Sequence, residues 1–383
     1  MNRLKELTLA AVKYSTLYKK SKKAVKKAKF TLKQRSSSRI SSMTPEEAYE
    51  IIMKDYQKPV NDLDHIPRVK KRSCLVSVIV AAYNVEDYIE VCLDSILREI
   101  DGLKAEIIVT DDGSTDRTPD ILKQYQKKYG IKLLHTQNGG CTHAQNAALE
   151  IASGKYLMFV DSDDYLLEGV MRHLLRLIRK EQADIACCNY IYFSDYAKTR
   201  GTKLESGVYT DFPDKCKVHG FAWGKLYHHK VFDDVKFLER YFFGDTINYW
   251  LNFKRCGKVV ISNFYGYAYR ENLNGSSLKK SRGTRCFDTL WIVSDLLDVR
   301  ERLGIPVDGD DVVLFLRHMT EHSYHRLRDL NDRQKEAFFV YAAHMLETGG
   351  FPALQDPEWD EVYQMFVRRD FGMWKLYSEY ACG

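Results

Sequence analysis

The sequence contains no apolar run that approaches the roughly 20 residues needed to cross a bilayer. Its amino terminus lacks the apolar core of a secretion signal, and its nine cysteines include no Cys-x-x-Cys pair. An odd number of cysteines without such a pair argues against a disulfide framework and against a structural zinc site. We therefore expect a chain that is neither secreted nor membrane-spanning and that stays in the reducing cytoplasm.

The charge of the chain is concentrated at its start. Residues 1–35 contain twelve Lys or Arg against a single acid, Glu6, so this segment carries +11 and the rest of the chain −5. Apolar residues recur in it at helical spacing, from Leu4 to Leu32, which predicts a basic amphipathic helix. Such a helix suits an anionic membrane surface. A partner helix, a disordered tail and a nucleic-acid arm are the alternatives, and we expect no nucleic acid because the rest of the chain shows no interleaving of basic and aromatic residues.

The 383 residues, of which 45% are hydrophobic, suffice for a full α/β core and additional elements. Buried-strand patterns at 75–83, 105–112, 131–135 and 155–160 alternate with helical patterns from about 86, at 117–129 and at 141–152. This alternation predicts βαβ crossovers and a mostly parallel central sheet flanked by helices. Four consecutive strands then end in polar or glycine-rich loops at one edge, where open α/β sheets bind ligands.

The fourth strand ends in a run of acids, Asp161, Ser162, Asp163 and Asp164. Asp161 and Asp163 are two residues apart, so in an extended chain they point the same way and can share one hard divalent ion with a diphosphate. This is the Asp-x-Asp pattern of nucleotide-sugar enzymes. The alternative is that these residues only cap the following helix.

Four segments in order, SVIVAAYN, IIVTDDGSTD, NGGCTHAQNAAL and YLMFVDSDDYL, resemble the nucleotide-binding half of family 2 glycosyltransferases of the GT-A fold. Further along, FAWGKLYHHKVF and YFFGDTINYWL resemble the acceptor half of the members that build bacterial surface polysaccharides. The resemblance implies a Rossmann-like α/β domain. Its nucleotide-sugar-binding half would span 74–195 and its acceptor-binding half 196–284, after a linker and short helix at 36–73 and before a helical region at 285–383.

By this resemblance the donor is a UDP-sugar, and one acid of the second strand end contacts the uracil ring. The residues alone do not decide between Asp111 and Asp112, and one of them could instead cap the turn at Gly113. Gln145 stands where many relatives have Arg, and the helix start at 138–146 would lie near the nucleotide. The residues expected to bind the nucleotide sugar are Ala82, Tyr83, Asn84, Asp111, Asp112, Asn138, Gln145, Asp161, Ser162 and Lys225.

The family pattern places Asp161 on the ribose and Asp163 on the metal, which would be Mn²⁺ or Mg²⁺, with Asp164 as a helper. Asp245 resembles the catalytic base, although Gly244 stands before it where Glu is common. Deprotonation by Asp245 opposite the leaving group implies inversion at the anomeric carbon. A helix cap is the alternative role for Asp245, and Glu239 is a weaker candidate for the base.

Other residues are weaker candidates for contacts with the donor. Trp223, Lys225 and Tyr227 resemble a loop over the donor, in which Lys225 could reach a phosphate and Trp223 could equally be core. Arg270 and Ser276 could approach the diphosphate. We expect His219 to be structural. Beyond 285 the pattern predicts helices at 287–302, 312–327, 333–348 and 358–380, whose three histidines, His318, His322 and His325, we assign to a helix face rather than to a metal.

The sequence thus predicts a metal-dependent inverting glycosyltransferase, peripherally associated with the inner face of the cell membrane. Its acceptor would be a glycan or a lipid-linked oligosaccharide, and a homo-oligomer is possible. Two other classes stay open. One is a catalytically silent nucleotide-sugar-binding or scaffold protein. The other is a metal-dependent nucleotidyltransferase, which would usually have a glycine- and Arg/Lys-rich loop after the first strand that VAAYNVED lacks.

Overall fold

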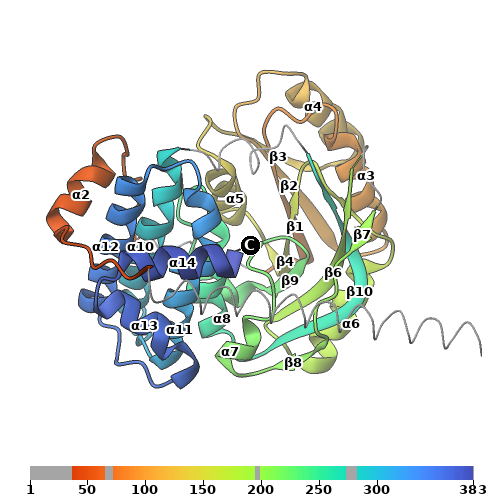
Figure 1. Ribbon diagram of the computed structural model, residues 1–383. Helices are drawn as coiled ribbons and strands as arrows, with labels where there is room; N and C mark the ends of the chain where they lie inside the picture. Colours follow the sequence, from red (N-terminus) through yellow and green to blue (C-terminus); the bar gives the residue numbers. More distant parts are fainter. Residues whose placement is uncertain (1–36, 65–71, 195–198, 273–282, 383) are drawn as a thin grey trace, which may run out of the picture. The chain divides into compact units, whose positions relative to one another are not determined.

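The computed structural model describes residues 37–64, 72–194, 199–272 and 283–382 (Figure 1). The described residues divide into two compact units, of which the larger lies within residues 57–281 and 288–306 and the smaller within residues 37–56, 283–287 and 307–382. The predicted basic helix of residues 1–35 lies outside the described residues. Among the described residues, no helix is both long and apolar enough to cross a bilayer.

The larger unit is built on one mixed sheet. Eight strands follow the order β3-β2-β1-β4-β9-β6-β10-β5, while β7 pairs with β6 and β8 with β10. Their bounds are β1 Cys74–Ala82, β2 Ala105–Asp111, β3 Lys132–His135, β4 Gly154–Asp161, β5 Tyr165–Leu166, β6 Ile185–Phe193, β7 Arg200–Gly201, β8 Gly207–Tyr209, β9 Lys225–His228 and β10 Val259–Arg270. Strands β3, β2, β1, β4, β6 and β10 run in one direction, whereas β9 is antiparallel to both of its neighbours. The predicted α/β class with its mostly parallel sheet is confirmed.

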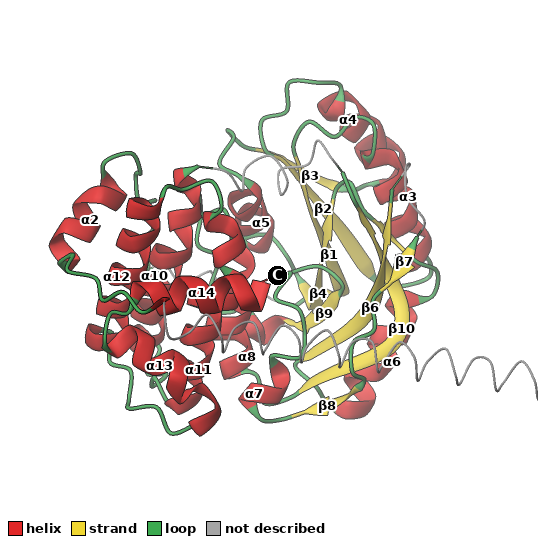
Figure 2. Cartoon of the chain, in the orientation of Figure 1, coloured by secondary structure: helices red, strands yellow, loops and turns green. Residues whose placement is uncertain are grey.

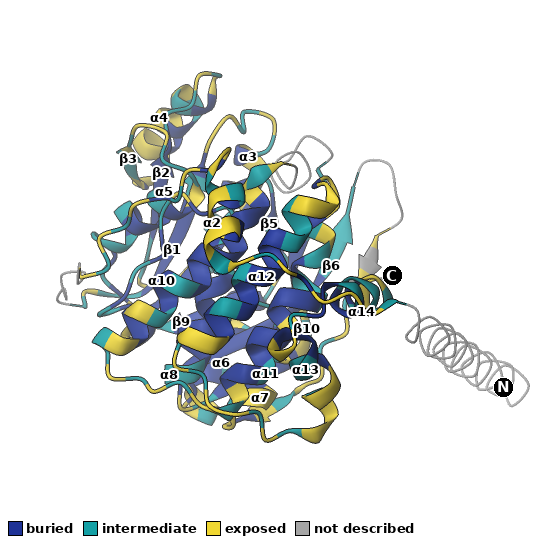
Figure 3. Ribbon diagram, turned by 60° about the vertical axis from the view of Figure 1, so that its left-hand side comes forward, coloured by how far each residue is buried: buried dark blue, intermediate teal, exposed yellow. Residues whose placement is uncertain are grey.

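Helices cover both faces of the parallel part of this sheet. Helices α3 (Ile89–Ile100), α4 (Thr118–Tyr129) and α6 (Val170–Glu181) share one face (Figure 2), and α5 (Cys141–Leu149) contacts β1 and β2 from the other. Val76, Val78 and Val80 of β1 are fully buried in the cluster to which α3 and α6 contribute Leu93 and Leu174. Because alternate strand residues point to opposite faces, a strand covered on both sides must be apolar throughout. Figure 3 shows β1 and its surroundings coloured as buried.

Short elements connect the second half of the larger unit. They are α7 (Phe212–Lys215), η1 (His229–Val231), the 3₁₀ turn η2 (Gly244–Thr246), the π-helical turn η3 (Asn248–Asn252), α8 (Phe253–Arg255) and α10 (Asp288–Arg302). The chain passes through three helical geometries, and Trp250, Leu251 and Phe253 are all buried. Packing of these bulky side chains overrides a regular α-helix.

The smaller unit is helical, as predicted for the carboxyl-terminal region. It contains α2 (Pro45–Met53), η4 (Thr284–Phe287), α11 (Gly309–Arg317), η5 (His318–His322), η6 (Tyr324–Leu327), α12 (Asp332–Thr348), η7 (Pro357–Trp359), α13 (Asp360–Val367) and α14 (Phe371–Cys382). The expected helix 358–380 is two helices, because Arg369 adopts φ 53° between them. The break between α13 and α14 lets Phe366 of α13 and Trp374 of α14 both contact Phe339 of α12.

Candidate active site

The predicted site residues gather where β1, β2 and β4 end. In the sheet register Ala82 lies beside Asp111 of β2, and Ala81 lies beside Asp161 of β4. Parallel strands bring their carboxyl ends to one edge, so acids that are distant in sequence become neighbours there.

Three carboxylates interact electrostatically at this edge. Burial, together with the neighbouring charges of Asp163 and Asp245, raises the pKa of Asp161 from its ordinary value to about 7. Burial also raises the pKa of Asp163. The fold thus brings Asp245, which is more than 80 positions later in the sequence, near the Asp-x-Asp pair.

The segment after Asp161 is held by β10. The amide of Asp161 donates to the Tyr267 hydroxyl at 3.0 Å, and Asp164 Oδ1 accepts the Arg270 amide at 2.7 Å. Arg270 Nε donates to the Asp163 carbonyl at 2.9 Å. The next helix, α6, has Gly169 at its N-cap without a side-chain cap. The alternative that the acids merely cap this helix is therefore wrong.

Arg270 sits in an aromatic slot, with its guanidinium carbon 4.7 Å from the Tyr88 ring centroid and 4.5 Å from that of Phe193. These contacts and the bond to the Asp163 carbonyl hold a positive charge beside the acids. The approach of Arg270 to a diphosphate stays a prediction. Ser276 lies outside the described residues.

Asp111 and Asp112 are both buried and have different partners. Asp111 Oδ1 accepts the Ser114 amide at 3.1 Å and so closes the turn at Gly113, while its Oδ2 lies 3.0 Å from His135 Nδ1. Asp112 accepts the amides of Gly139 and Gly140 at 3.0 and 2.7 Å, together with the Thr136 hydroxyl at 3.1 Å.

The start of α5 therefore already has an anionic partner. The expectation that this helix end offers free amides to the nucleotide is corrected for Gly139 and Gly140, because the Asp112 carboxylate accepts both N–H groups. Asp112 accepts from three donors and Asp111 from fewer, so Asp111 retains more capacity to contact a base.

The loop after β1 forms the rim of the same edge. Ala82 is buried, whereas the Tyr83 side chain is 45% exposed. Asn84 adopts φ 51°, and its Oδ1 accepts the Thr115 amide at 2.8 Å while its own amide donates to Ser114 Oγ at 3.0 Å. These bonds fix Asn84 to the β2 loop and leave the Tyr83 ring open to a ligand.

The other predicted contacts differ in accessibility. Asn138 is exposed beside Gly113, where a Cβ would meet the Asn138 amide nitrogen at 3.0 Å. Gln145 and Ser162 are buried, with 6% and 7% exposure. Asn138 can therefore contact a ligand directly, whereas Gln145 lies within the packing of α5.

The side chain of Lys225 is not exposed toward a ligand, contrary to the prediction. It is fully buried in β9, and its ammonium donates to the Phe221 carbonyl at 2.5 Å and lies 2.9 Å from His219 Nδ1. Burial lowers its pKa to about 8. The expected contact with a phosphate is thus not made, because the side chain points into the core to satisfy a loop carbonyl. Trp223 and Tyr227, at 4% and 0% exposure, are core residues.

Asp245 lies in the middle of the η2 turn and is partly exposed. The N-cap of this turn is Phe243, so a capping role does not account for Asp245. Gly244 before it is buried, and a Cβ there would lie 2.2 Å from Thr142 Cγ2 of α5. Thr142 therefore occupies the space that a side chain at 244 would need.

Both carboxylate oxygens of Glu239, the weaker candidate for the base, contact side chains of α5. Its Oε2 lies 2.8 Å from His143 Nδ1, and its Oε1 accepts the Asn146 side-chain amide at 2.9 Å. Although burial would raise it, these hydrogen bonds lower the pKa of Glu239. Glu239 thus holds α5 in place through both carboxylate oxygens.

Cys141, which the sequence reasoning missed, opens α5 at the same edge. It is exposed, and it lies near enough to Asp161 and Asp112 for their charges to act on its thiol. The signal available in the sequence was its place directly after the Asn-Gly-Gly turn.

The acids fit a hard divalent cation that is shared with a substrate. No group of three or more His, Cys, Asp or Glu within the described ranges is arranged as a metal centre. Mg²⁺, however, usually takes only one or two protein carboxylates and completes its shell with phosphate oxygens and water. Asp161 and Asp163 provide such a pair, and a cation would relieve the repulsion that raises the pKa of Asp161.

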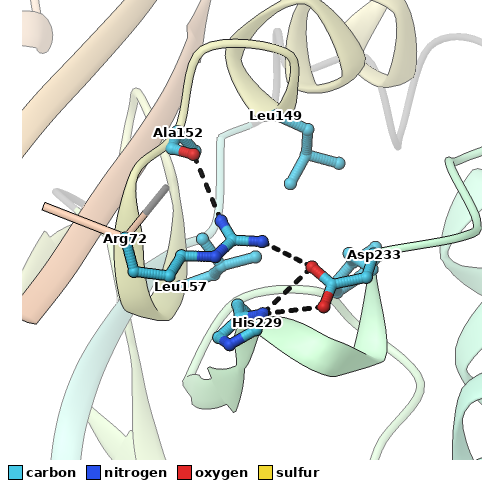
Figure 4. Close-up of a pocket in the computed structure, with 7 residues that line it drawn as sticks. Arg72, Leu149, Ala152, Leu157, His229 and Asp233 are labelled. Atoms are coloured by element: carbon cyan, nitrogen blue, oxygen red, sulfur yellow. Dashed lines mark hydrogen bonds and ion pairs between the residues drawn. The ribbon is translucent and has the colours of Figure 1, made fainter. Parts of the chain in front are cut away.

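A small cavity lies at the opposite end of the strands, near the start of β4 (Figure 4). Its volume is about 20 Å³, which holds a water molecule and not a nucleotide sugar. Arg72 bridges the Ala152 carbonyl at 3.3 Å and Asp233 at 2.5 Å, and His229 contacts the same carboxylate at 2.8 Å. This network fastens the entry of β1 to the end of β9.

Comparison with known protein families agrees with the geometry. The model of Glycosyl transferase family 2 matches residues 77–236. EpsH of Bacillus subtilis, which is named as a glycosyltransferase, is 36% identical over 169 residues, covering 41% of this chain and 48% of EpsH. The glycosyltransferase EpsJ of the same organism is 32% identical over 214 residues, covering 52% of this chain and 62% of EpsJ. The chain thus spans about half to three fifths of these relatives.

Among solved structures, Staphylococcus aureus TarS 1-349 in complex with UDP-GlcNAc superposes with a TM-score of 0.56 over 80% of this chain and 90% of that one. The sequences are 16% identical, so this similarity concerns the fold. It confirms the predicted GT-A type.

Proposed function

The domain at residues 77–236 belongs to glycosyl transferase family 2, and on that premise we propose that the chain is a metal-dependent, inverting glycosyltransferase. The donor is a UDP-sugar, and the acceptor is a glycan or lipid-linked oligosaccharide of a bacterial surface polysaccharide. The observation that carries the proposal is that Asp163 and Asp245 lie near enough to Asp161, at the carboxyl edge of the sheet, for their charges to raise its pKa. The TarS complex with UDP-GlcNAc supports the choice of a UDP-sugar.

In the proposed mechanism Asp245 removes the proton of the acceptor hydroxyl. The hydroxyl oxygen attacks the anomeric carbon as its bond to UDP breaks, and single displacement inverts the configuration. Asp163 and Asp161 would hold Mn²⁺ or Mg²⁺, which when bound offsets the negative charge of the departing diphosphate as a Lewis acid. Asp111 contacts the uracil, and Asn84 and Asn138 line the nucleotide pocket.

Asp163→Asn and Asp245→Asn test the proposal. Each should lower UDP release and sugar transfer in the presence of Mn²⁺ by at least about 100-fold, because a positioned base or metal ligand contributes on this order. The matched control is Asp120→Asn, an exposed acid in the first turn of α4. Circular dichroism should show unchanged folding for all three. Normal turnover by the Asp245 variant would refute the base assignment.

The same assay separates the alternative functions. A nucleotidyltransferase would release pyrophosphate instead of UDP. A silent binding protein would bind UDP-sugars without any hydrolysis or transfer. The two departures from the family pattern, Gly244 and Gln145, fit an active enzyme, since Thr142 fills the space at one and the other is buried.

We further propose that the protein works at the cytoplasmic face of the cell membrane, with residues 1–35 on anionic lipid. The +11 charge of that segment supports this placement. Nucleic acid is not among the proposed partners, and a homo-oligomer stays a proposal.

A further inference from the structure

Phe221 is a large apolar side chain that the proposed mechanism does not use. It precedes the buried strand β9 and is 39% exposed, whereas Trp223 two residues later is 4% exposed. An exposed aromatic ring beside an active site is a candidate for ligand contact, although single exposed apolar residues are common on surfaces. The residues around Phe221 decide whether it is a ligand contact or an ordinary exposed side chain.

The Phe221 ring belongs to a stack that reaches the acids. It lies 4.7 Å from the Trp223 ring at an interplanar angle of 9°, and Trp223 lies 4.6 Å from Tyr267 at 10°. The Tyr267 hydroxyl accepts the Asp161 amide at 3.0 Å. Three nearly parallel rings thus lead from the exposed Phe221 to the Asp-x-Asp strand end, and the two inner rings hold the outer one.

The loop of Phe221 is also fastened to the segment that carries the base. The Gly220 carbonyl accepts the Asn248 side-chain amide at 2.6 Å, and the Val218 carbonyl accepts the Tyr249 hydroxyl at 3.1 Å. Asn248 and Tyr249 lie in η3, directly after the η2 turn with Asp245. Phe221 is therefore positioned with respect to both the base and the acids.

We propose that Phe221 is the residue on which the acceptor sugar stacks, so that the acceptor terminates in a pyranose ring. This inference rests on the proposed glycosyltransferase function. A pyranose has an apolar C–H face that packs on an aromatic ring, while its hydroxyls remain free to approach Asp245.

Three variants test the stack: Phe221→Leu, Phe221→Ala and Phe221→Tyr. The probes are β-linked trisaccharides of glucose and of N-acetylglucosamine, with ribitol 5-phosphate as an acyclic, anionic probe. The Leu and Ala variants should raise the trisaccharide KM roughly three- to tenfold, an effect typical of one aromatic contact, and Tyr should retain it. The kcat and the acceptor-free hydrolysis of the UDP-sugar should not change. Tyr129→Leu, which removes an exposed ring at the end of α4, is the matched control.

Saturation-transfer NMR of trisaccharide binding keeps the test independent of turnover. Loss of the signal in Phe221→Leu and its retention in Phe221→Tyr supports the stack. Equal KM values and signals in wild type and Phe221→Leu overturn it, as does binding of ribitol phosphate in preference to every trisaccharide. Absence of hydrolysis and transfer in the wild type, with intact trisaccharide binding at Phe221, instead counts against the proposed function alone.

Discussion

Thr142 explains the glycine before the proposed base. A Cβ at position 244 would lie 2.2 Å from Thr142 Cγ2, far inside van der Waals contact. The chain has Gly-Asp at this place, and Thr142 of α5 fills the space beside Gly244. The two positions should therefore depend on each other.

Gly244→Glu should destabilise the protein by about 1–3 kcal/mol, the usual cost of overpacking. Thr142→Ser removes the clashing methyl group, so the double variant should recover part of the loss. Chemical denaturation of both single variants and the double variant measures the coupling. Strictly additive effects would show that Thr142 is not the obstacle.

The raised pKa of Asp161 predicts that the stability of the protein depends on pH. Its pKa is raised from the ordinary value of 3.8 to about 7, so protonation is favoured in the folded protein. The stability it contributes is complete below pH 4 and is lost as pH rises toward 7, when the charged form must be accommodated. Without divalent cations, Asp161→Asn should therefore melt above wild type at pH 8, and the difference should shrink toward pH 4.

Binding of Mn²⁺ with UDP should show the reverse trend. Because the cation requires the ionised carboxylate, affinity should rise up to about tenfold per pH unit below pH 7 and level off above it. Calorimetry in buffers of different ionisation enthalpy would detect the released proton. A pH-independent affinity between pH 5.5 and 8 would contradict the role of Asp161.

The helix α5 depends on an acid from another element. Asp112 follows β2 directly and accepts the amides of Gly139 and Gly140, which open the helix without a cap of their own. Asp112→Ala leaves these donors without the carboxylate. We expect a loss of about 1–2 kcal/mol, as for removal of an N-cap side chain.

Urea denaturation measures this loss, and Asp112→Asn, which keeps one acceptor oxygen, should fall between Ala and wild type. Since α5 carries Cys141 and Thr142 into the site, the Ala variant should also weaken donor binding. Full stability of Asp112→Ala would contradict the capping role.

The chain as a whole carries opposite charges in two parts, with +11 on residues 1–35 and −5 on the remainder. Each basic residue near an anionic lipid surface contributes about 1 kcal/mol. Deleting residues 1–35 should therefore reduce sedimentation with phosphatidylserine vesicles at least tenfold while transfer to a soluble acceptor is preserved. Neutral phosphatidylcholine vesicles and high salt serve as controls. Unchanged sedimentation would remove the proposed membrane role.

Local chemistry made the strands and the strand-end acids predictable from the sequence. The apolar runs ending in Asp111 and Asp161 can satisfy their backbone and bury both faces only as interior parallel strands, so the sheet and the edge where its acids gather followed. The GT-A type followed from the resemblance of the sequence motifs to family 2 glycosyltransferases. The helices whose ends carry clear signals were also recovered. Among them, α4 ends at Gly130 in the left-handed region, close to its predicted end.

Tertiary structure decided which of these residues face a ligand. Lys225 looks like a phosphate contact in sequence, but a buried carbonyl draws its ammonium inward, and Asp112 is drawn to a helix start formed by residues 27 and 28 positions later. The approach of Asp245 to Asp161, the obstruction of Gly244 by Thr142 and the ring stack ending at Phe221 all join residues far apart along the chain. Such contacts depend on how helices and strands pack, and no local pattern encodes them.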